Sequence, residues 1–329
     1  MSTIKKVAEE AKVSVATVSR VLNSTGYVNE ETRKKVLKVI KELDYKPNSV
    51  ARSLFKKQSM TIALIVPNIT NPFFPEVARA IEDVLSSKDY TLILCNSDDN
   101  SEKEKKYFEV MKQKYVDGVI VVTSTLTPQY IEEKGIPIVA VDRFIDPAIP
   151  CVSVNNIEGA KRAVQYLKST GCKKIAHIRG PKNITSAEDR YLGYLNEVES
   201  ESWFETDYVR CGNFNIEQTT EVTRKLLEEN PDIDGIFAGN DLMAVGVIKA
   251  AMQLGKRIPE DLSVIGFDGI SLCKMTNPEI TTIAQPIYEI GSVAAQTLLD
   301  LIEGRAIEKK HHQLEVTIDK GQSTKTRGE

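Results

Sequence analysis

Cysteine and histidine are scarce in this 329-residue chain. The five cysteines, Cys95, Cys151, Cys172, Cys211 and Cys273, are scattered, odd in number and without C-x-x-C spacing. This pattern favours reduced, mostly buried thiols over a disulfide framework or a zinc site. The three histidines are too few and too dispersed to form a cluster of metal ligands. We therefore expect no metal and no cofactor.

Long apolar runs are also missing. The longest ones are far too short to span a bilayer, and the N-terminal "MSTIKKVAEEAKV" carries charges where a secretory signal needs an unbroken apolar stretch. We expect a cytoplasmic protein that makes no membrane contact. A secreted binding protein of the transport type is not expected.

Motifs of the common α/β enzymes are absent as well. The sequence has no G-x-x-x-x-G-K-[ST], no G-x-G-x-x-G and no G-x-S-x-G, and no histidine lies near a plausible nucleophile motif. Asp98, Asp99 and Glu102 form an acidic cluster, but they fall where a solvated loop begins a helix. We expect a protein that is not an enzyme.

The net charge of −3 hides an uneven distribution. Residues 1–57 hold 13 Lys and Arg against 6 Asp and Glu, a net charge of +7, which leaves −10 for the remainder. A basic segment joined to an acidic body indicates that the first segment alone meets a polyanion.

The basic segment has the pattern of three short helices. Ile4, Val7, Ala8 and Ala11 recur at helical spacing in the first. Ser14 is a good N-cap for a second helix, Val15 to Leu22, with Val18, Val21 and Leu22 facing inward. Asn29 caps a third helix that ends near Leu43. Two short helices joined by a tight turn predict a helix-turn-helix.

The second helix carries side chains suited to DNA. Val15, Ala16, Thr17 and Arg20 lie on its exposed side or leading end. A guanidinium group reads guanine in two contacts, while Thr17 and Ser19 suit phosphate oxygens. A helical hairpin that only contacts proteins is the alternative, and the local positive charge favours DNA.

The segment after Pro47, "NSVARSLFKKQS", is too short to form a stable helix alone in water. It could be a polar linker, or it could fold on a partner and insert Leu54 into a base step from the minor groove. Composition leaves these two alternatives about even.

The stretches "VSVATVSRVLN", "TRKKVLKVIKELDYKPN" and "SVARSL" resemble the DNA-binding head and hinge helix of the lactose/galactose repressor family of bacterial transcription regulators. The resemblance covers this whole region. It implies a nucleoid-associated homodimer on a near-palindromic operator, with Val15, Ala16 and Arg20 at the recognition positions and Leu54 in the minor groove. The full set of implied DNA contacts is Ser14, Val15, Ala16, Thr17, Ser19, Arg20, Asn23, Asn29, Thr32, Tyr45, Asn48, Ala51 and Leu54.

From Thr61 onward, apolar runs alternate with helical patterns, which predicts parallel sheets covered by helices on both faces. More than 250 residues exceed one sheet, so two lobes are expected. The predicted fold is an all-α helix-turn-helix head (1–46), a hinge helix and linker (47–58), and an α/β body (59–329) like a periplasmic binding protein. In the body, one lobe takes about 59–156 and 287–312, and the other about 157–286 and 313–329.

Ligands of open parallel sheets sit beyond the carboxyl ends of the strands. The residues that follow the predicted strands combine aromatic rings with planar polar groups, which suits a small polyhydroxylated ligand. They are Asn71, Phe73, Phe74, Asp142, Arg143, Arg190, Phe214, Asn240, Phe267, Asp268 and Gln285. Each also has a structural alternative: Asn240 and Asp268 could cap helices, and Asp142 with Arg143 could be a surface ion pair.

The body also resembles periplasmic sugar-binding proteins, and "TNPFF", "VDR", "TSAEDR", "GND", "IGFDG" and "TIAQ" are most similar to the ribose-binding type. That resemblance implies that a pentose lies between the lobes, stacked on Phe73 and Phe214. The residues that it implies as hydrogen-bond partners of the sugar are Asp142, Arg143, Arg190, Asn240, Asp268 and Gln285. Pro67 and Val154 stand where that type offers hydroxyl groups.

Together the two resemblances imply a sequence-specific repressor of sugar uptake and use genes that leaves its operator when the effector, D-ribose, closes the two lobes. The alternative is a catabolite-control regulator of the same family, cued by a serine-phosphorylated phosphocarrier protein. Those regulators carry an arginine where this chain has Gln296, which favours the ribose interpretation.

Overall fold

A computed structural model describes residues 3–23, 26–45, 58–123 and 125–326 of the chain. The chain divides into two compact units, Met1–Ser59 and Met60–Glu329. We call them the head and the body, and describe each by itself. The predicted hinge segment, with Asn48, Ala51 and Leu54, lies outside the described residues.

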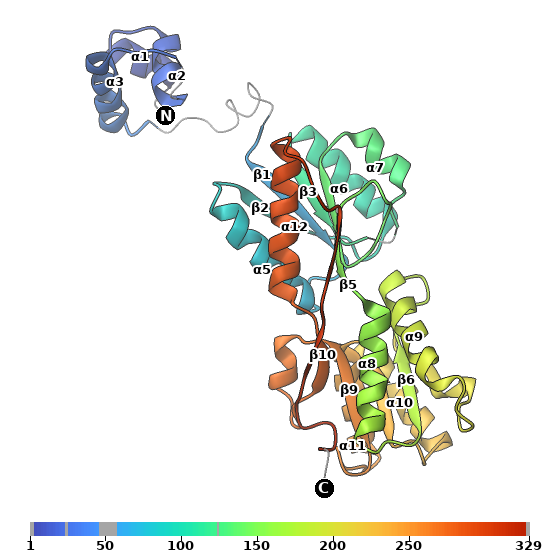
Figure 1. Ribbon diagram of the computed structural model, residues 1–329. Coiled ribbons are helices and arrows are strands. Elements are labelled where there is room, and N and C mark those ends of the chain that lie inside the picture. The colour runs from blue at the N-terminus through green and yellow to red at the C-terminus, as the bar shows by residue number, and fades with distance from the viewer. Residues whose placement is uncertain (1–2, 24–25, 46–57, 124, 327–329) are drawn as a thin grey trace. The chain divides into compact units, whose positions relative to one another are not determined.

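The head consists of three helices, α1 (Ile4–Glu10), α2 (Val15–Asn23) and α3 (Glu30–Glu42) (Figure 1). Short polar side chains begin each of them. The hydroxyl of Thr3 accepts from Lys6 N, that of Ser14 from Thr17 N at 3.1 Å, and Asn29 Oδ1 from Glu31 N at 2.8 Å. Because the first backbone N–H groups of a helix lack partners within the helix, these caps fix where α1, α2 and α3 start.

Apolar side chains from all three helices form one small core in the head. Its buried members are Val7, Ala8, Ala11, Val18, Val21, Val36 and Val39. Val18 and Val21 face this core, so the opposite side of α2 takes no part in packing the head. The helix-turn-helix expected from the sequence is confirmed.

The first lobe of the body is a six-stranded parallel sheet with strand order β11-β5-β4-β3-β1-β2. Its strands are β1 (Thr61–Val66), β2 (Thr91–Asn96), β3 (Gly118–Val121), β4 (Ile138–Val141), β5 (Cys151–Val154) and β11 (His311–Leu314). Its helices are α5 (Phe73–Ser86), α6 (Ser101–Gln113), α7 (Pro128–Lys134) and α12 (Ile287–Ile302).

Alternation along β1 explains how helices cover both faces of this sheet. Ile62, Leu64 and Val66 pack in the core that includes α5 and α12, whereas Ala63 and Ile65 pack in a second core with residues of α6 and α7. Successive side chains of a strand point to opposite faces, so an unbroken apolar run means burial on both. Figure 1 shows α5 and α12 side by side, and they contact each other closely.

The second lobe is also a six-stranded sheet, with order β12-β10-β9-β8-β6-β7, parallel except for the antiparallel β12. Its strands are β6 (Ile175–Arg179), β7 (Val209–Cys211), β8 (Gly235–Ala238), β9 (Ser263–Asp268), β10 (Thr281–Ala284) and β12 (Thr317–Asp319). Its helices are α8 (Asn156–Ser169), α9 (Thr185–Val198), α10 (Ile216–Glu229) and α11 (Asp241–Gln253), with short 3-10 turns at Thr206–Tyr208 and Ser271–Lys274. Helix α8 packs against α9, and α10 against α11.

The chain crosses between the lobes three times, after β5, after β10 and after β11 (Figure 1). The two parallel-sheet lobes expected from the sequence are confirmed. The last crossing differs slightly from the expected point after residue 312, because β11 continues to Leu314, which pairs with Val154. Residues 313 and 314 therefore belong to the first lobe.

Within the described part of the chain, none of the helices has the length and apolarity needed to cross a membrane. In the same residues, no three His, Cys, Asp or Glu side chains are grouped so that they could hold a metal ion. All five cysteines are free thiols, and four of them are buried, as expected.

Candidate functional site

A cavity of about 220 Å³ lies between the two lobes of the body, at the carboxyl ends of both sets of strands. We call it the cleft. Ten of the eleven predicted ligand residues line it: Asn71, Phe73, Phe74, Asp142, Arg143, Arg190, Phe214, Asn240, Asp268 and Gln285. The lining residues are spread along the sequence from Pro67 to Gln285, and the fold brings them together around one small cavity.

Phe267 is the exception, and its prediction as a cleft residue is wrong. Its side chain is fully buried, and the guanidinium Cζ of Arg190 lies 3.8 Å from its ring centroid. Its ring atoms Cε2 and Cζ meet α8, where a Cβ on Gly159 would lie only 2.8 Å away. Since neighbours on β9 face opposite ways, Asp268 reaches the cleft and Phe267 supports Arg190 from below.

The two adjacent phenylalanines begin α5 rather than end β1. Their ring centroids are 5.3 Å apart, with the planes at 89°, and both rings are buried at the cleft wall. Successive residues of a helix are rotated by only about 100°, so both can border one cavity. Asn71 Oδ1 accepts from Phe73 N at 3.1 Å and fixes this start.

Arg190 is the most tightly held polar group in the cleft. Its Nε donates to Asn156 Oδ1 at 2.9 Å, one terminal nitrogen donates to Gly239 O at 2.7 Å, and the other lies 3.0 Å from Asp268 Oδ1. The side chain is almost fully buried. Its direction is therefore fixed before any ligand arrives, which lowers the entropic cost of binding.

Asp268 is held from several sides. Its Oδ1 also accepts from Gln285 Nε2 at 2.8 Å. Burial raises the pKa of Asp268 to about 7, while the Arg190 charge opposes that rise. Asp241, just behind it, accepts from the N–H groups of Gly269 and Ile270 and from Thr282 Oγ1 at 2.6 Å, so it holds the turn that carries Asp268.

Asn240 has the structural role that the sequence left open, and it also faces the cleft. Its Oδ1 accepts from Met243 N at 2.9 Å and caps α11. The side-chain amide still has N–H donors to offer to a ligand, because only its oxygen serves the helix. Capping and ligand contact are compatible here.

On the first-lobe side, Arg143 is buried and forms an ion pair of 2.5 Å with Asp99, which is 37% exposed. Asp142 Oδ2 accepts from Ser186 Oγ at 3.3 Å and so joins the two lobes across the cleft. The expectation of a plain surface pair between Asp142 and Arg143 does not describe this arrangement, because Arg143 pairs with a residue 44 positions away.

Backbone strain gathers at the cleft. Five of its non-glycine residues have positive φ: Asp99 (51°), Asp142 (64°), Asn213 (53°), Phe214 (55°) and Asp268 (110°). Such conformations are uncommon for residues with a Cβ and persist where the surrounding structure imposes them. They aim these side chains into the cavity, which is the pattern of a binding site rather than of plain loops.

Pro67, which the sequence placed at a sugar-contacting position, also lines the cavity. Seven further lining residues were not expected from the sequence: Asn68, Asp99, Pro181, Ile184, Ser186, Asn213 and Asn215. Most of them directly follow a strand or begin a helix, so the rule of strand ends could have found Asn68 and Asn213. No local signal marks Asp99 as the partner of Arg143.

In the head, Val15, Ala16 and Arg20 are exposed on α2, with Val15 41% exposed. Thr17, Ser19 and Thr32 are half-buried. Ser14 and Asn29 cap helices, and Tyr45 packs against the core of the head. Asn23 ends α2, and its side chain is outside the described part.

Two family models match the chain. Residues 3–48 match the bacterial regulatory proteins of the lacI family, and residues 59–324 match the periplasmic binding proteins and sugar-binding domain of that family. The second match alone covers most of the chain.

Among curated relatives, the ribose operon repressor of Halalkalibacterium halodurans is 50% identical over 99% of this chain and 98% of its own length. Catabolite control protein A of Priestia megaterium is 39% identical over 98% of this chain and 99% of its own.

Two solved structures are also similar. The lac repressor dimer bound to operator has a TM-score of 0.87 at 26% identity and covers 99% of both chains. A lacI-family regulator from Enterococcus faecium with bound ribose has a TM-score of 0.73 at 32% identity, covering 80% of this chain and 98% of its own.

Proposed function

Because this chain belongs to the lacI family of bacterial regulatory proteins and is a sugar-responsive transcriptional repressor, we propose that ribose is the sugar it senses. The further elements of the proposal are that it acts as a homodimer on operator DNA and that ribose releases it. Family membership places it among DNA-binding regulators rather than enzymes.

The observation that carries the proposal is the composition of the cleft. Phe73 and Phe214 offer flat apolar surfaces, and Asp142, Arg143, Arg190, Asn240, Asp268 and Gln285 surround them with donors and acceptors. A pentose has the matching character, since its C–H face is apolar and its rim carries hydroxyl groups.

The size of the cleft points the same way. Its volume of about 220 Å³ lies below the range of about 300–1,000 Å³ typical of drug-sized ligands, so it suits a monosaccharide. A ribose-bound relative and a relative named for the ribose operon support this identity.

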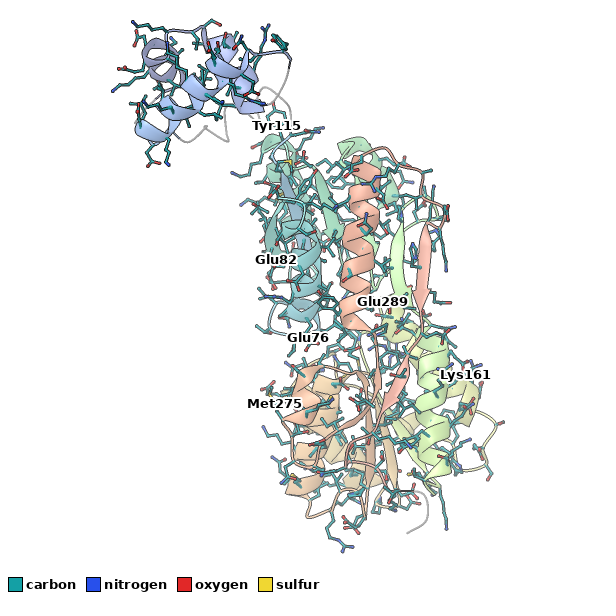
Figure 2. The ribbon with its side chains drawn as sticks, turned by 60° about the vertical axis from the view of Figure 1, so that its left-hand side comes forward. Glu76, Glu82, Tyr115, Lys161, Met275 and Glu289 are labelled. Carbon is teal, nitrogen blue, oxygen red and sulfur yellow. The ribbon has the colours of Figure 1, made fainter. Side chains whose placement is uncertain are left out.

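We propose that closure of the lobes is the signal. Two contacts already join them: Ser186 Oγ donates to Asp142, and Ser271 N donates to Glu76 Oε1 at 3.1 Å. Figure 2 shows Glu76 at the end of the first lobe that adjoins the second. A sugar that touches both lobes favours the closed form, and a coupling of about 1–3 kcal/mol would lower operator affinity by about 5- to 150-fold.

In the head, we propose that α2 enters the major groove, with Val15, Ala16 and Arg20 toward the bases and with Thr17 and Ser19 toward phosphates. The exposure of these residues supports this. The implied contacts from Asn48, Ala51 and Leu54 remain predictions on undescribed residues.

The catabolite-control alternative finds less support. Where those regulators carry an arginine, the exposed Gln296 has no charge, and its Nε2 donates to Asp300 on the same helix at 2.9 Å. A neutral side chain at that position offers a phosphoserine no ion pair.

The direct test starts from DNA selected by the full-length protein out of a random duplex library. Fluorescence anisotropy then measures affinity for that duplex with and without ribose, and thermal shift compares ribose with related sugars. We expect ribose to raise the unfolding temperature and to weaken DNA binding. Ribose that changes neither quantity would refute the proposal.

A further inference from the structure

One of the two contacts between the lobes lies outside the cleft and bears on how closure is held, an inference that rests on the proposed function. Glu76, in the first turn of α5, accepts a hydrogen bond of 3.1 Å from the backbone N–H of Ser271, which begins the 3-10 turn after β9. Neither residue lines the cavity. A sugar in the cleft therefore does not compete for this bond.

Both ends of the bond are close in sequence to cleft residues. In the first lobe, Glu76 shares the first turn of α5 with Phe73 and Phe74, whose rings border the cavity. In the second lobe, Ser271 comes three positions after Asp268, which lines the cavity from the other side. The bond thus ties together two backbone segments that carry cleft residues, one from each lobe.

The N–H group of Ser271 is presented by a well-held turn. Asp241 Oδ2 accepts from the two preceding N–H groups, those of Gly269 at 2.7 Å and Ile270 at 2.9 Å. The side chain of Ile270 is buried, and a Cβ on Gly269 would lie 2.6 Å from that of Ala284, so the turn is closely packed. Because the donor is already oriented, little conformational freedom is lost when the bond forms.

The acceptor is held as well. Glu76 is half-buried, and its helix α5 packs closely against α12 in the first lobe. A hydrogen bond to an ionised carboxylate is stronger than one between neutral groups. This bond stabilises only those arrangements in which the lobes approach closely enough to share it.

We propose that Glu76 is a positioning residue, which fastens the lobes in the closed arrangement through Ser271 and thereby sets the ribose concentration at which the repressor responds. A contact made only in the closed form raises the population of that form. The apparent affinity for a ligand that binds the closed form rises with this population, so Glu76 acts on ribose binding from outside the cleft.

The experiment is calorimetric titration of the full-length protein with ribose. In Glu76→Ala we expect ribose affinity to fall by about 3- to 10-fold, the range for one hydrogen bond. The ribose concentration that half-releases the selected duplex should rise by a similar factor. Glu76→Gln keeps an acceptor oxygen without the charge, so it should lose less affinity than Glu76→Ala.

Ser271 supplies a matched pair of variants. Ser271→Pro removes the N–H donor, and the backbone accepts it: Ile270 has φ −69° and ψ 154°, as a residue before proline prefers, and Ser271 begins a 3-10 helix. Ser271→Ala keeps the donor and loses only the hydroxyl group. We expect the proline variant to lose affinity as Glu76→Ala does, and the alanine variant to match the wild type.

The double variant Glu76→Ala with Ser271→Pro decides whether the two residues act through one bond. Its loss of ribose affinity should equal that of either single variant, because each already removes the whole bond. Losses that add would contradict the inference. So would a loss in Ser271→Ala equal to that in Ser271→Pro, because the N–H group would then not be the cause.

A second measurement does not depend on ribose. Mass spectrometry can follow hydrogen exchange of residues 269–275 in the protein alone, and we expect it to be about 3-fold faster or more in Glu76→Ala than in the wild type. Unchanged exchange would overturn the bond between the lobes. A wild type that binds no ribose would overturn the proposed function, whereas equal ribose affinity of Glu76→Ala and the wild type would overturn this inference alone.

Discussion

In the head, the residues proposed to read DNA bases come from one short stretch, Val15 to Arg20, on the exposed side of one helix. In the body, the residues that line the cleft come from many separate segments between Pro67 and Gln285. The head presents side chains on a surface, whereas the cleft buries them in ion pairs and hydrogen bonds with one another. The difference means that single substitutions should separate the two activities cleanly, with larger losses in the cleft.

The largest effect is expected from Arg190→Ala. Truncating one partner of a buried, hydrogen-bonded charge pair costs about 2–5 kcal/mol, so ribose affinity should fall by about 30-fold or more. DNA binding should persist and no longer respond to ribose, which anisotropy would measure.

Arg179→Ala is the control for that variant. Arg179 is buried in the same lobe, pairs with Glu188 and stacks on Tyr191 at 4.4 Å, but it does not line the cleft. Arg179→Ala also removes a buried arginine from the second lobe. Because Arg179 does not line the cleft, this variant should keep the ribose response. A ribose response in Arg190→Ala equal to that of the wild type would show that the site is misplaced.

Arg20→Ala tests the other side of the comparison. Loss of a base-reading arginine costs about 1–3 kcal/mol, so affinity for the selected duplex should fall by roughly 5- to 150-fold while ribose binding is unchanged. Lys38→Ala, an exposed change on α3 that removes a pair with Glu42, should weaken DNA binding less. Equal losses on selected and random duplexes would argue against base reading by Arg20.

Phe73→Ala should cost about 10-fold in ribose affinity, because an aromatic contact contributes about 0.5–1.5 kcal/mol beyond the area it buries. Phe108→Ala supplies the comparison, since Phe108 is buried in the same lobe on α6 and away from the cleft. Both variants lose stability by cavity formation, but only Phe73→Ala should lose ribose affinity in calorimetry. A similar loss in both would reduce Phe73 to a packing residue.

The smallest expected effect is a dependence of the stability of the body on pH, which the head does not share. His177 is fully buried in the body, its Nδ1–H donates to Phe237 O at 2.8 Å, and burial lowers its pKa to about 3. In the unfolded chain, His177 takes up a proton as the pH falls below the ordinary histidine pKa of about 6.5, whereas in the folded body it does not. Stability of the body should therefore fall as pH drops below that value, by about 1 kcal/mol between pH 7 and 5.5.

The chain offers a convenient probe for this. Its single tryptophan, Trp203, lies in the body, and the sequence of the head contains neither tryptophan nor histidine. Thermal unfolding followed by Trp203 fluorescence should show the pH dependence, and His177→Gln should reduce it. An equal pH dependence in His177→Gln would assign it to other groups.

The sequence predicted the helices of the head closely, because each starts at a local cap that the sequence displays: Ser14 for α2 and Asn29 for α3. It predicted two parallel-sheet lobes because apolar runs buried on both faces alternate with amphipathic helices. It also predicted most of the cleft, since polar residues at strand ends meet at one edge of a parallel sheet.

The misses have a common cause. Phe267 and Asp268 are neighbours in one motif, and only the packing of α8 against β9 decides which of them faces the cleft. The extension of β11 to Leu314 likewise depends on its pairing with β5.

What the sequence by itself determined was the set of local structures and the chemistry gathered at the strand ends, because caps, periodicity and turn residues act over a few positions. What only the tertiary structure decided was which of these groups pair. Asp99 balances Arg143 across 44 positions, and Arg190 gathers acceptors from Asn156, Gly239 and Asp268. Such pairs depend on how distant segments pack, and no local pattern encodes that packing.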